Sequence, residues 1–312
     1  MANFEPLKHD IFCLEAHFLR DEFASLYLMQ DQDEVAIIET GTCHSIENLL
    51  ETLQLLKIDP QQIKYVIPTH IHLDHAGGAG QMMALFEQAR LIVHPRGARH
   101  MIDPTRLIQG SIEVYGEQQF QQLYGEILPI AAERIDCAYD NDRFQLGSRE
   151  LLFIDTPGHA RHHFCIFDQQ SNGIFSGDTF GSGYPPLKNH PRGLIPTTTP
   201  IHFDPAAFVT SIDRLLELKP EKMYLTHYGL LENPKMYGPS LKQWITEFAD
   251  LCTKIRPDDE KGAKALEGAM ATLIVDQLSD QFKSEDVHRW LDTDINLNTQ
   301  GLVHWWRSGQ HG

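Results

Sequence analysis

Residues 69–78 read THIHLDHAGG and form the densest group of potential metal ligands in the chain. The segment follows an apolar stretch that predicts a buried strand ending at Pro68, and its two glycines allow a sharp turn. On an extended backbone alternate side chains point the same way, so the first two imidazoles share a direction while the next two ligands turn away. One short loop can therefore serve two neighbouring metal ions through His70, His72, Asp74 and His75.

Three more residues of ligand type stand just after later apolar segments that predict strands: His159, Asp178 and His227. Their local sequences are PGH, SGD and LTH. Each of these residues alone is more often a capping or hydrogen-bonded structural group. Together with residues 69–78 they form one pattern, in which ligands collect at the ends of strands.

The order HxHxDH, PGH, GD and a final histidine resembles the metallo-β-lactamase superfamily, above all its glyoxalase II-like hydrolases, over about residues 10–230. The resemblance implies an α/β (α+β) fold, the four-layer αβ/βα metallo-β-lactamase sandwich, with the metals at one edge. It also implies a first metal ion held by His70, His72 and His159. A second ion would be held by Asp74, His75 and His227, and Asp178 would bridge the two.

Such a binuclear site lowers the pKa of bound water and polarises a carbonyl or phosphoryl oxygen. The predicted function is hydrolysis of a small ester, thioester or lactone through a metal-bridging hydroxide, with Asp74 as the catalytic proton acceptor. Two divalent ions are the expected cofactors, Zn²⁺ first, and iron or manganese would fit the same ligands.

Other functions stay open at this point. Two irons in these ligands could bind or reduce dioxygen or nitric oxide, and a phosphodiesterase would use the same ions on a phosphoryl group. Asp178 stands where zinc β-lactamases of the commonest subclass have a cysteine, and flavodiiron-type reductases usually have a glutamate in place of His72. The first difference weighs against hydrolysis of β-lactams, and the second weighs against flavodiiron-type reduction. Residues 39–41 read ETG where many members have DTG, at a position expected just behind the ligands.

Candidate substrate-binding residues lie near these ligands. The irregular, proline-rich segment 181–204 directly follows Asp178, so it is expected to border the pocket. Solvated charges and simple packing are the alternative roles for these candidates, which are Tyr184, Lys188, Arg192 and Tyr228.

Composition limits the partners. The 312 residues carry a formal net charge of -17, which disfavours nucleic acid as a partner and leaves a small-molecule substrate. The five cysteines include no CxxC pair and are expected to be buried free thiols. The sequence shows neither a secretory signal nor an apolar run long enough to span a membrane, so a cytoplasmic protein is expected.

Residues 1–232 are expected to form the metallo-β-lactamase-fold domain, and residues 233–312 a helical extension packed on it. Apolar residues in the extension follow helical spacing, and they predict either core or the surface of a homodimer. The aromatic tail 302–306 is expected to be docked. The acidic pair Asp292 and Asp294 is expected on a solvated face.

Overall fold

The computed structural model describes residues 2–198 and 201–309. The chain forms two compact units and passes from one to the other several times. Unit 1 comprises Met1–Asp155, His162–Gly177 and Lys222–Leu230, and unit 2 comprises Thr156–Arg161, Asp178–Glu221 and Leu231–Gly312. The division expected between residues 1–232 and 233–312 stays a prediction.

Unit 1 contains a seven-stranded mixed sheet whose strands follow one another in chain order. The first four strands pair antiparallel, and β4 to β7 pair parallel. Parallel neighbours require crossovers, which α1 (Ser45–Leu56), α3 (Ala79–Leu85) and α4 (Pro95–Ile102) provide. The strands are β1 (Phe4–Pro6), β2 (Ile11–Glu15), β3 (Ser25–Asp31), β4 (Glu34–Ile38), β5 (Ile63–Ile67), β6 (Arg90–Val93) and β7 (Ile135–Cys137).

The second sheet has six strands in the order β13-β12-β11-β10-β9-β8 and is also mixed. Strands β8 to β11 pair antiparallel, and β11 pairs parallel with β12. The strands are β8 (Arg143–Leu146), β9 (Arg149–Asp155), β10 (Phe164–Asp168), β11 (Gly173–Gly177), β12 (Lys222–Leu225) and β13 (Gly229–Glu232). Short 3₁₀ helices are η1 (Pro60–Gln62), η2 (Ala132–Arg134) and η3 (Pro234–Met236).

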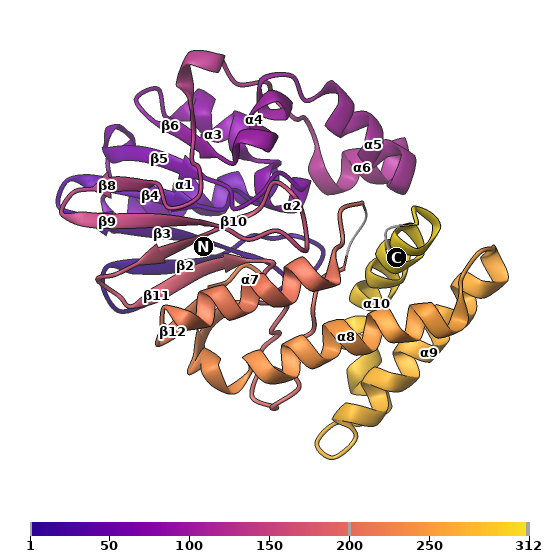
Figure 1. Cartoon of the computed structure of the whole chain (residues 1–312). Coiled ribbons are helices and arrows are strands. Elements are labelled where there is room, and N and C mark those ends of the chain that lie inside the picture. The colour runs from indigo at the N-terminus through magenta and orange to yellow at the C-terminus, as the bar shows by residue number, and fades with distance from the viewer. Residues whose placement is uncertain (1, 199–200, 310–312) are drawn as a thin grey trace. The chain divides into compact units, whose positions relative to one another are not determined.

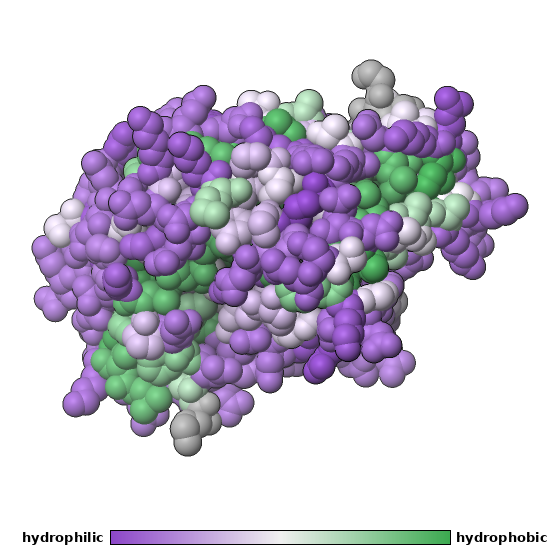
Figure 2. Space-filling model, turned by 90° about the horizontal axis from the view of Figure 1, so that it is seen from below, coloured by the Kyte–Doolittle hydropathy of each residue, from purple (hydrophilic) through white to green (hydrophobic). Residues whose placement is uncertain are grey.

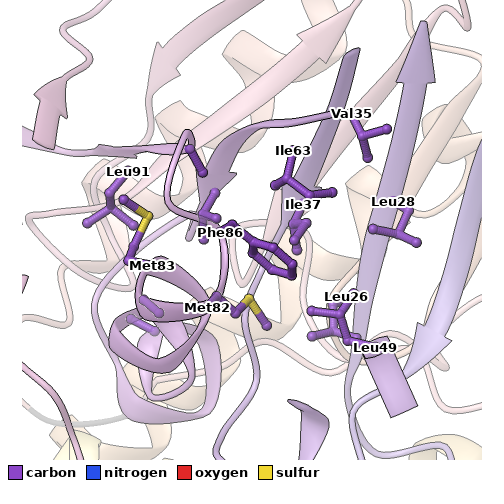
Figure 3. Packing of buried hydrophobic residues seen from close by; sticks show 14 of the residues in the cluster. Leu26, Leu28, Val35, Ile37, Leu49, Ile63, Met82, Met83, Phe86 and Leu91 are labelled. Carbon is purple, nitrogen blue, oxygen red and sulfur yellow. The ribbon is translucent and has the colours of Figure 1, made fainter. Parts of the chain in front are cut away.

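Alternate residues of the first sheet face two different apolar clusters, as the two-residue period of a strand requires. Leu28 and Ile37 pack with Met82 and Phe86 on the helical side (Figure 3). Their neighbours Met29, Ala36 and Ile38 belong instead to a cluster with Phe153, Phe164 and Phe175 of the second sheet. Because both faces of the strands are covered, β3 and β4 read as almost continuous apolar runs.

Polar contacts join the two sheets at one end. The backbone N–H groups of Gly147 and Ser148, in the turn between β8 and β9, donate to the carboxylates of Glu34 (2.6 Å) and Asp31 (2.5 Å). Glu34 also accepts from Lys64 Nζ of β5 at 2.7 and 2.8 Å. One turn of the second sheet is thereby fixed to the hairpin of β3 and β4.

A fully buried arginine lies in the same unit. Arg149 of β9 donates to Asp168 Oδ2 of β10 at 3.2 Å and to the carbonyl oxygen of His9. Asp168 also accepts the N–H of Ser171 at 3.1 Å. The pair is thus both buried and hydrogen-bonded.

Helices α5 (Thr105–Tyr115) and α6 (Glu117–Tyr124) form a hairpin in unit 1 (Figure 1). Unit 2 contains α7 (Pro205–Glu217), α8 (Gly238–Ile255), α9 (Glu260–Leu278) and α10 (Ser284–Arg307). The helical stripes expected after residue 234 are confirmed as core: Trp244, Phe248 and Met270 are buried.

The C-terminal helix confirms one expectation and corrects another. The aromatic tail is docked, since Trp305 is buried with its ring 5.9 Å from that of Phe203. Asp294 was expected on a solvated face, and this was wrong: it is buried, and a hydrogen bond from the hydroxyl of Tyr184 at 3.0 Å offsets the cost of burying its carboxylate. Its neighbour Asp292 is exposed.

The fold class is confirmed as two mixed sheets with flanking helices, followed by the C-terminal helices α8 to α10. The five cysteines, all within the described part of the chain, are free thiols, although Cys43 and Cys137 are only half-buried. Within residues 2–198 and 201–309, no helix has both the length and the apolarity to cross a membrane. Figure 2 shows one face on which hydrophobic residues gather in patches among hydrophilic ones.

Candidate metal centre

The ligand-rich segment bends where the sequence predicts. His72 is extended, with φ -63° and ψ 147°, and directly precedes the short helix α2 (Leu73–Ala76). His70 Nε2 and His72 Nδ1 lie 2.9 Å apart, so the first two imidazoles converge. Asp74 and His75 lie on the helical turn, and the His75 ring lies 4.0 Å from the ring of His70.

Asp74, His75 and His227 form a cluster inside unit 1. Asp74 Oδ2 lies 3.5 Å from His75 Nε2 and 3.5 Å from His227 Nε2. One ligand atom from each residue lies within 4.8 Å of the others. Both histidines are buried and the aspartate is half-buried. This arrangement of two nitrogens and one carboxylate is consistent with metal binding.

The buried carboxylate of Glu39 fixes the orientation of His75. It accepts from His75 Nδ1 at 3.1 Å, from Thr69 Oγ1 at 2.6 Å and from Thr226 Oγ1 at 2.9 Å. Since Nδ1 donates to Glu39, Nε2 is the nitrogen that can bind a metal. The same carboxylate joins the ends of β5 and β12, which precede ligands His70 and His227.

His227 is oriented by the start of β3. Its Nδ1 donates to the carbonyl oxygen of Phe23 at 2.9 Å, which again leaves Nε2 as the metal-binding nitrogen. The backbone N–H of Ser25 donates to the carbonyl oxygen of Thr226 at 2.8 Å. The Tyr27 hydroxyl donates to the carbonyl oxygen of Leu225 at 2.5 Å. The turn that carries this ligand is therefore held on both sides.

Unit 2 contains the other two candidate ligands. His159 Nε2 lies 3.3 Å from Asp178 Oδ2, and His159 Nδ1 is 2.9 Å from the carbonyl oxygen of Thr197. Gly158 has φ +137° and packs so closely on α7 that an added Cβ would lie 2.3 Å from Phe208 Cα. Only glycine fits this approach, so the turn that carries His159 depends on it.

Comparison with known families decides the identity of the fold. A family model described as the metallo-beta-lactamase superfamily matches residues 19–227. The chain belongs to the metallo-beta-lactamase superfamily. The match covers every candidate ligand, and the resemblance inferred from the order of the motifs is confirmed.

Relatives within the superfamily differ in their named activities. The metallo-beta-lactamase fold-containing protein ST1585 of Sulfurisphaera tokodaii is 27% identical over 230 residues, covering 72% of this chain and 80% of its own. Its crystal structure has a TM-score of 0.66 and covers 95% of this chain and 99% of its own. The acyl-coenzyme A thioesterase MBLAC2 of Gallus gallus is 23% identical over 80% of this chain and 88% of its own. The hydroxyacylglutathione hydrolase GloC of Haemophilus influenzae is 24% identical over 53% and 70%.

The residues predicted to bind substrate in this superfamily member have intramolecular partners. Besides the contact between Tyr184 and Asp294, Arg192 donates to Glu247 at 2.5 Å and lies 4.0 Å above the ring of Trp244. Lys188 is half-buried in the same loop. The substrate roles of these three residues stay predictions.

Tyr228, the fourth candidate, is half-buried. Burial raises the pKa of the Tyr228 hydroxyl, and the charges of Cys13 and Glu15 raise it further. The substrate-binding role predicted for Tyr228 also stays a prediction.

Sequence reasoning missed a group of aromatic rings in unit 1. Tyr124 stacks on Phe18 with ring centroids 5.8 Å apart, and Tyr115 lies edge-on to Tyr124 at 5.9 Å. Phe23 lies 5.7 Å from Phe18 and 5.3 Å from the ring of His227. No periodicity marks this group, because folding alone brings residues 18–23 and the hairpin of α5 and α6 together.

Proposed function

We propose that this metallo-beta-lactamase-fold chain is a binuclear metal-dependent hydrolase that cleaves a small ester, thioester or lactone. The observation that carries the proposal is the orientation of His75 and His227. Both rings use Nδ1 for a hydrogen bond to oxygen, and both bring Nε2 to the same oxygen of Asp74. Protein histidines that bind metals are oriented in this way.

The ligand assignment follows the order of the motifs. We assign the first ion to His70, His72 and His159 and the second to Asp74, His75 and His227, with Asp178 shared. The donor chemistry fits divalent ions, because imidazole nitrogens and carboxylates are the ligands that zinc prefers, and iron and manganese accept the same set.

Two bound divalent ions would supply a water of lowered pKa and would polarise the carbonyl oxygen of the substrate. The chain itself supplies a proton acceptor in Asp74, which is half-buried and so remains within reach of solvent. Glu39 and the carbonyl of Phe23 hold the imidazoles next to Asp74 in fixed orientations, which lowers the cost of organising the site.

A thioester is the first substrate class to test. Two of the relatives are named as an acyl-coenzyme A thioesterase and a hydroxyacylglutathione hydrolase. Both names describe removal of an acyl group from a thiol carrier. This chain is only distantly similar to either, so esters and lactones belong in the same screen.

The first experiment measures metal identity and stoichiometry in protein purified without added metal and with air excluded. We expect about two zinc ions per chain, together with hydrolysis of thioesters or lactones in a screen that includes phosphodiesters. About two irons per chain and no hydrolysis would overturn the proposal in favour of dioxygen or nitric oxide chemistry. Failure to bind metal even after soaking in zinc would overturn the ligand assignment itself.

A further inference from the structure

Four aromatic side chains of unit 1 form a continuous group, called here the aromatic wall: Phe18, Phe23, Tyr115 and Tyr124. Two of them come from the segment between β2 and β3, and two from the hairpin of α5 and α6. Successive ring centroids lie 5.7 to 5.9 Å apart, within the range of favourable aromatic contacts. The wall therefore joins two parts of the chain about 100 residues apart.

The wall lies beside the proposed ligands of the second metal ion. At one end, the Phe23 ring lies edge-on to the His227 ring, and the Phe23 backbone accepts from that histidine. From Phe18 the wall continues through Tyr124 to Tyr115, with ring centroids 5.8 and 5.9 Å apart.

The members of the wall differ in exposure. Phe18, Phe23 and Tyr124 are buried and form its base, whereas Tyr115 is only half-buried. Leu19 and Val114, the chain neighbours of Phe18 and Tyr115, are 50% and 52% exposed. No residue of α5, all of which is described, is fully buried, although the helix includes Ile108, Ile112 and Val114. Partly exposed apolar and aromatic side chains of this kind are typical of ligand-binding surfaces.

We propose that the aromatic wall binds the apolar acyl part of the substrate and that Tyr115 is the residue that determines acyl-chain specificity. The inference rests on the proposed hydrolysis for the position of the reacting carbonyl, next to Asp74 and His227. The acyl chain attached to that carbonyl then extends along the wall, with the Tyr115 ring as its exposed contact. Substrates with a short polar acyl group leave this contact unused.

The test compares hexanoate with acetate, the product acids of an apolar and a minimal acyl group, by calorimetric titration of the metal-loaded protein. Burial of one methylene group changes affinity about fourfold, so hexanoate should bind at least tenfold more tightly than acetate. Tyr115→Ala should weaken hexanoate binding about tenfold and leave acetate unchanged. Tyr115→Phe, which keeps the ring, should stay within about twofold of wild type.

Two further variants test whether a loss of hexanoate affinity is specific to the aromatic wall. Val114→Glu changes an exposed position, so it should leave the fold intact while the new charge beside the wall lowers hexanoate affinity. Tyr139→Ala removes an equally large ring that is 62% exposed and outside the wall, and it should change neither affinity. Equal binding of hexanoate and acetate by wild type, or equal effects of Tyr115→Ala and Tyr139→Ala, would overturn the proposal.

Kinetics separate this inference from the proposed function. With hexanoyl and acetyl thioesters, Tyr115→Ala should raise KM about tenfold for the hexanoyl substrate alone and change kcat little. Hydrolysis without any dependence on acyl length would support the proposed function and refute acyl-chain binding by the aromatic wall. Tight hexanoate binding through Tyr115 by a protein that hydrolyses no ester, thioester or lactone would support acyl-chain binding by the aromatic wall and refute the proposed function.

Discussion

At the scale of single residues, Asp74 has the most demanding position in the candidate centre. One of its oxygens faces the Nε2 atoms of both His75 and His227, yet the side chain is not fully enclosed. We expect Asp74→Asn to lower kcat by about 10²- to 10⁴-fold, because the amide cannot accept the proton. Steady-state kinetics and metal analysis check this together. Turnover close to wild type would show that Asp74 is not the proton acceptor.

Glu39 contributes through the residues it orients. Its carboxylate accepts hydrogen bonds from three side chains, including His75, and glutamine offers fewer acceptor sites at the same size. We expect Glu39→Gln to weaken zinc affinity by about 10- to 100-fold, as measured by competition with a chelator. The exposed Glu87→Gln is the matched control and should bind zinc like wild type. Unchanged affinity in Glu39→Gln would mean that His75 needs no such support.

Residue types and spacing led to seven candidate ligands, whose roles stay predictions, but they gave no indication of the partners of other polar side chains. The contacts of Tyr184 with Asp294 and of Arg192 with Glu247 join positions far apart in the chain. No local pattern announces such pairs. The aromatic wall escaped prediction for the same reason.

At the scale of elements, the contact of Glu34 with the turn between β8 and β9 makes stability depend on pH. Burial opposes ionisation, but hydrogen bonds from Lys64 and Gly147 outweigh it and lower the pKa of Glu34 from its ordinary value of 4.5. A lowered pKa means that the folded state favours the carboxylate. Its contribution is therefore present above pH 4.5 and is lost as the pH falls through the lower, folded-state pKa.

We expect Glu34→Gln to lower the free energy of unfolding at pH 7 by about 0.5 kcal/mol, a small value because the side chain is partly exposed. The difference from wild type should shrink in acid. Urea unfolding at several pH values measures it, with the exposed Glu221→Gln as control. A difference that stays constant into acid would show that the charge of Glu34 does not stabilise the fold.

The buried pair of Arg149 and Asp168 links two neighbouring strands, β9 and β10. Arg149→Met should destabilise the fold by about 3–5 kcal/mol, because it leaves the Asp168 carboxylate buried without its partner. Arg149→Met combined with Asp168→Leu should recover much of the loss, since both charges are then gone. Chemical unfolding of the two variants decides this, and a single variant as stable as wild type would contradict it.

Prediction of elements succeeded where apolar runs were long enough. The interiors of β5, β11 and β12 were evident as buried strands, whereas the short edge strands β1 and β13 were not. Helix α2 has only four residues, too few to show a helical period. Such short elements take their conformation from tertiary contacts.

At the scale of the whole molecule, metal binding should appear as stability. A ligand present at 100 times its Kd stabilises the folded state by about 2.7 kcal/mol, which corresponds to roughly 4 °C in Tm for a chain of this size. We expect chelator-treated protein to melt lower by this amount and zinc to restore it. An identical Tm with and without metal would argue against a resident ion.

The fold class followed from the ligand motifs, and the predicted division of the chain at residue 232 stays a prediction. Packing groups segments 156–161 and 178–221 with the C-terminal helices, which chain order alone does not indicate. A cytoplasmic location, a small-molecule partner and a homodimer are global properties that stay predictions.

The parallel pairing of β11 with β12 has a consequence for synthesis on the ribosome. Residues 178–221 separate the two strands in the chain, so the edge of β11 stays unpaired until they have been made, for roughly 2–10 s at ordinary elongation rates. An open strand edge invites pairing with other chains. A nascent chain that stalls in this interval therefore exposes a strand edge that can pair with other chains. It also lacks His227, which is synthesised just after β12. The pairing of β11 with β12 and the synthesis of the last candidate ligand therefore depend on the same short stretch of the chain.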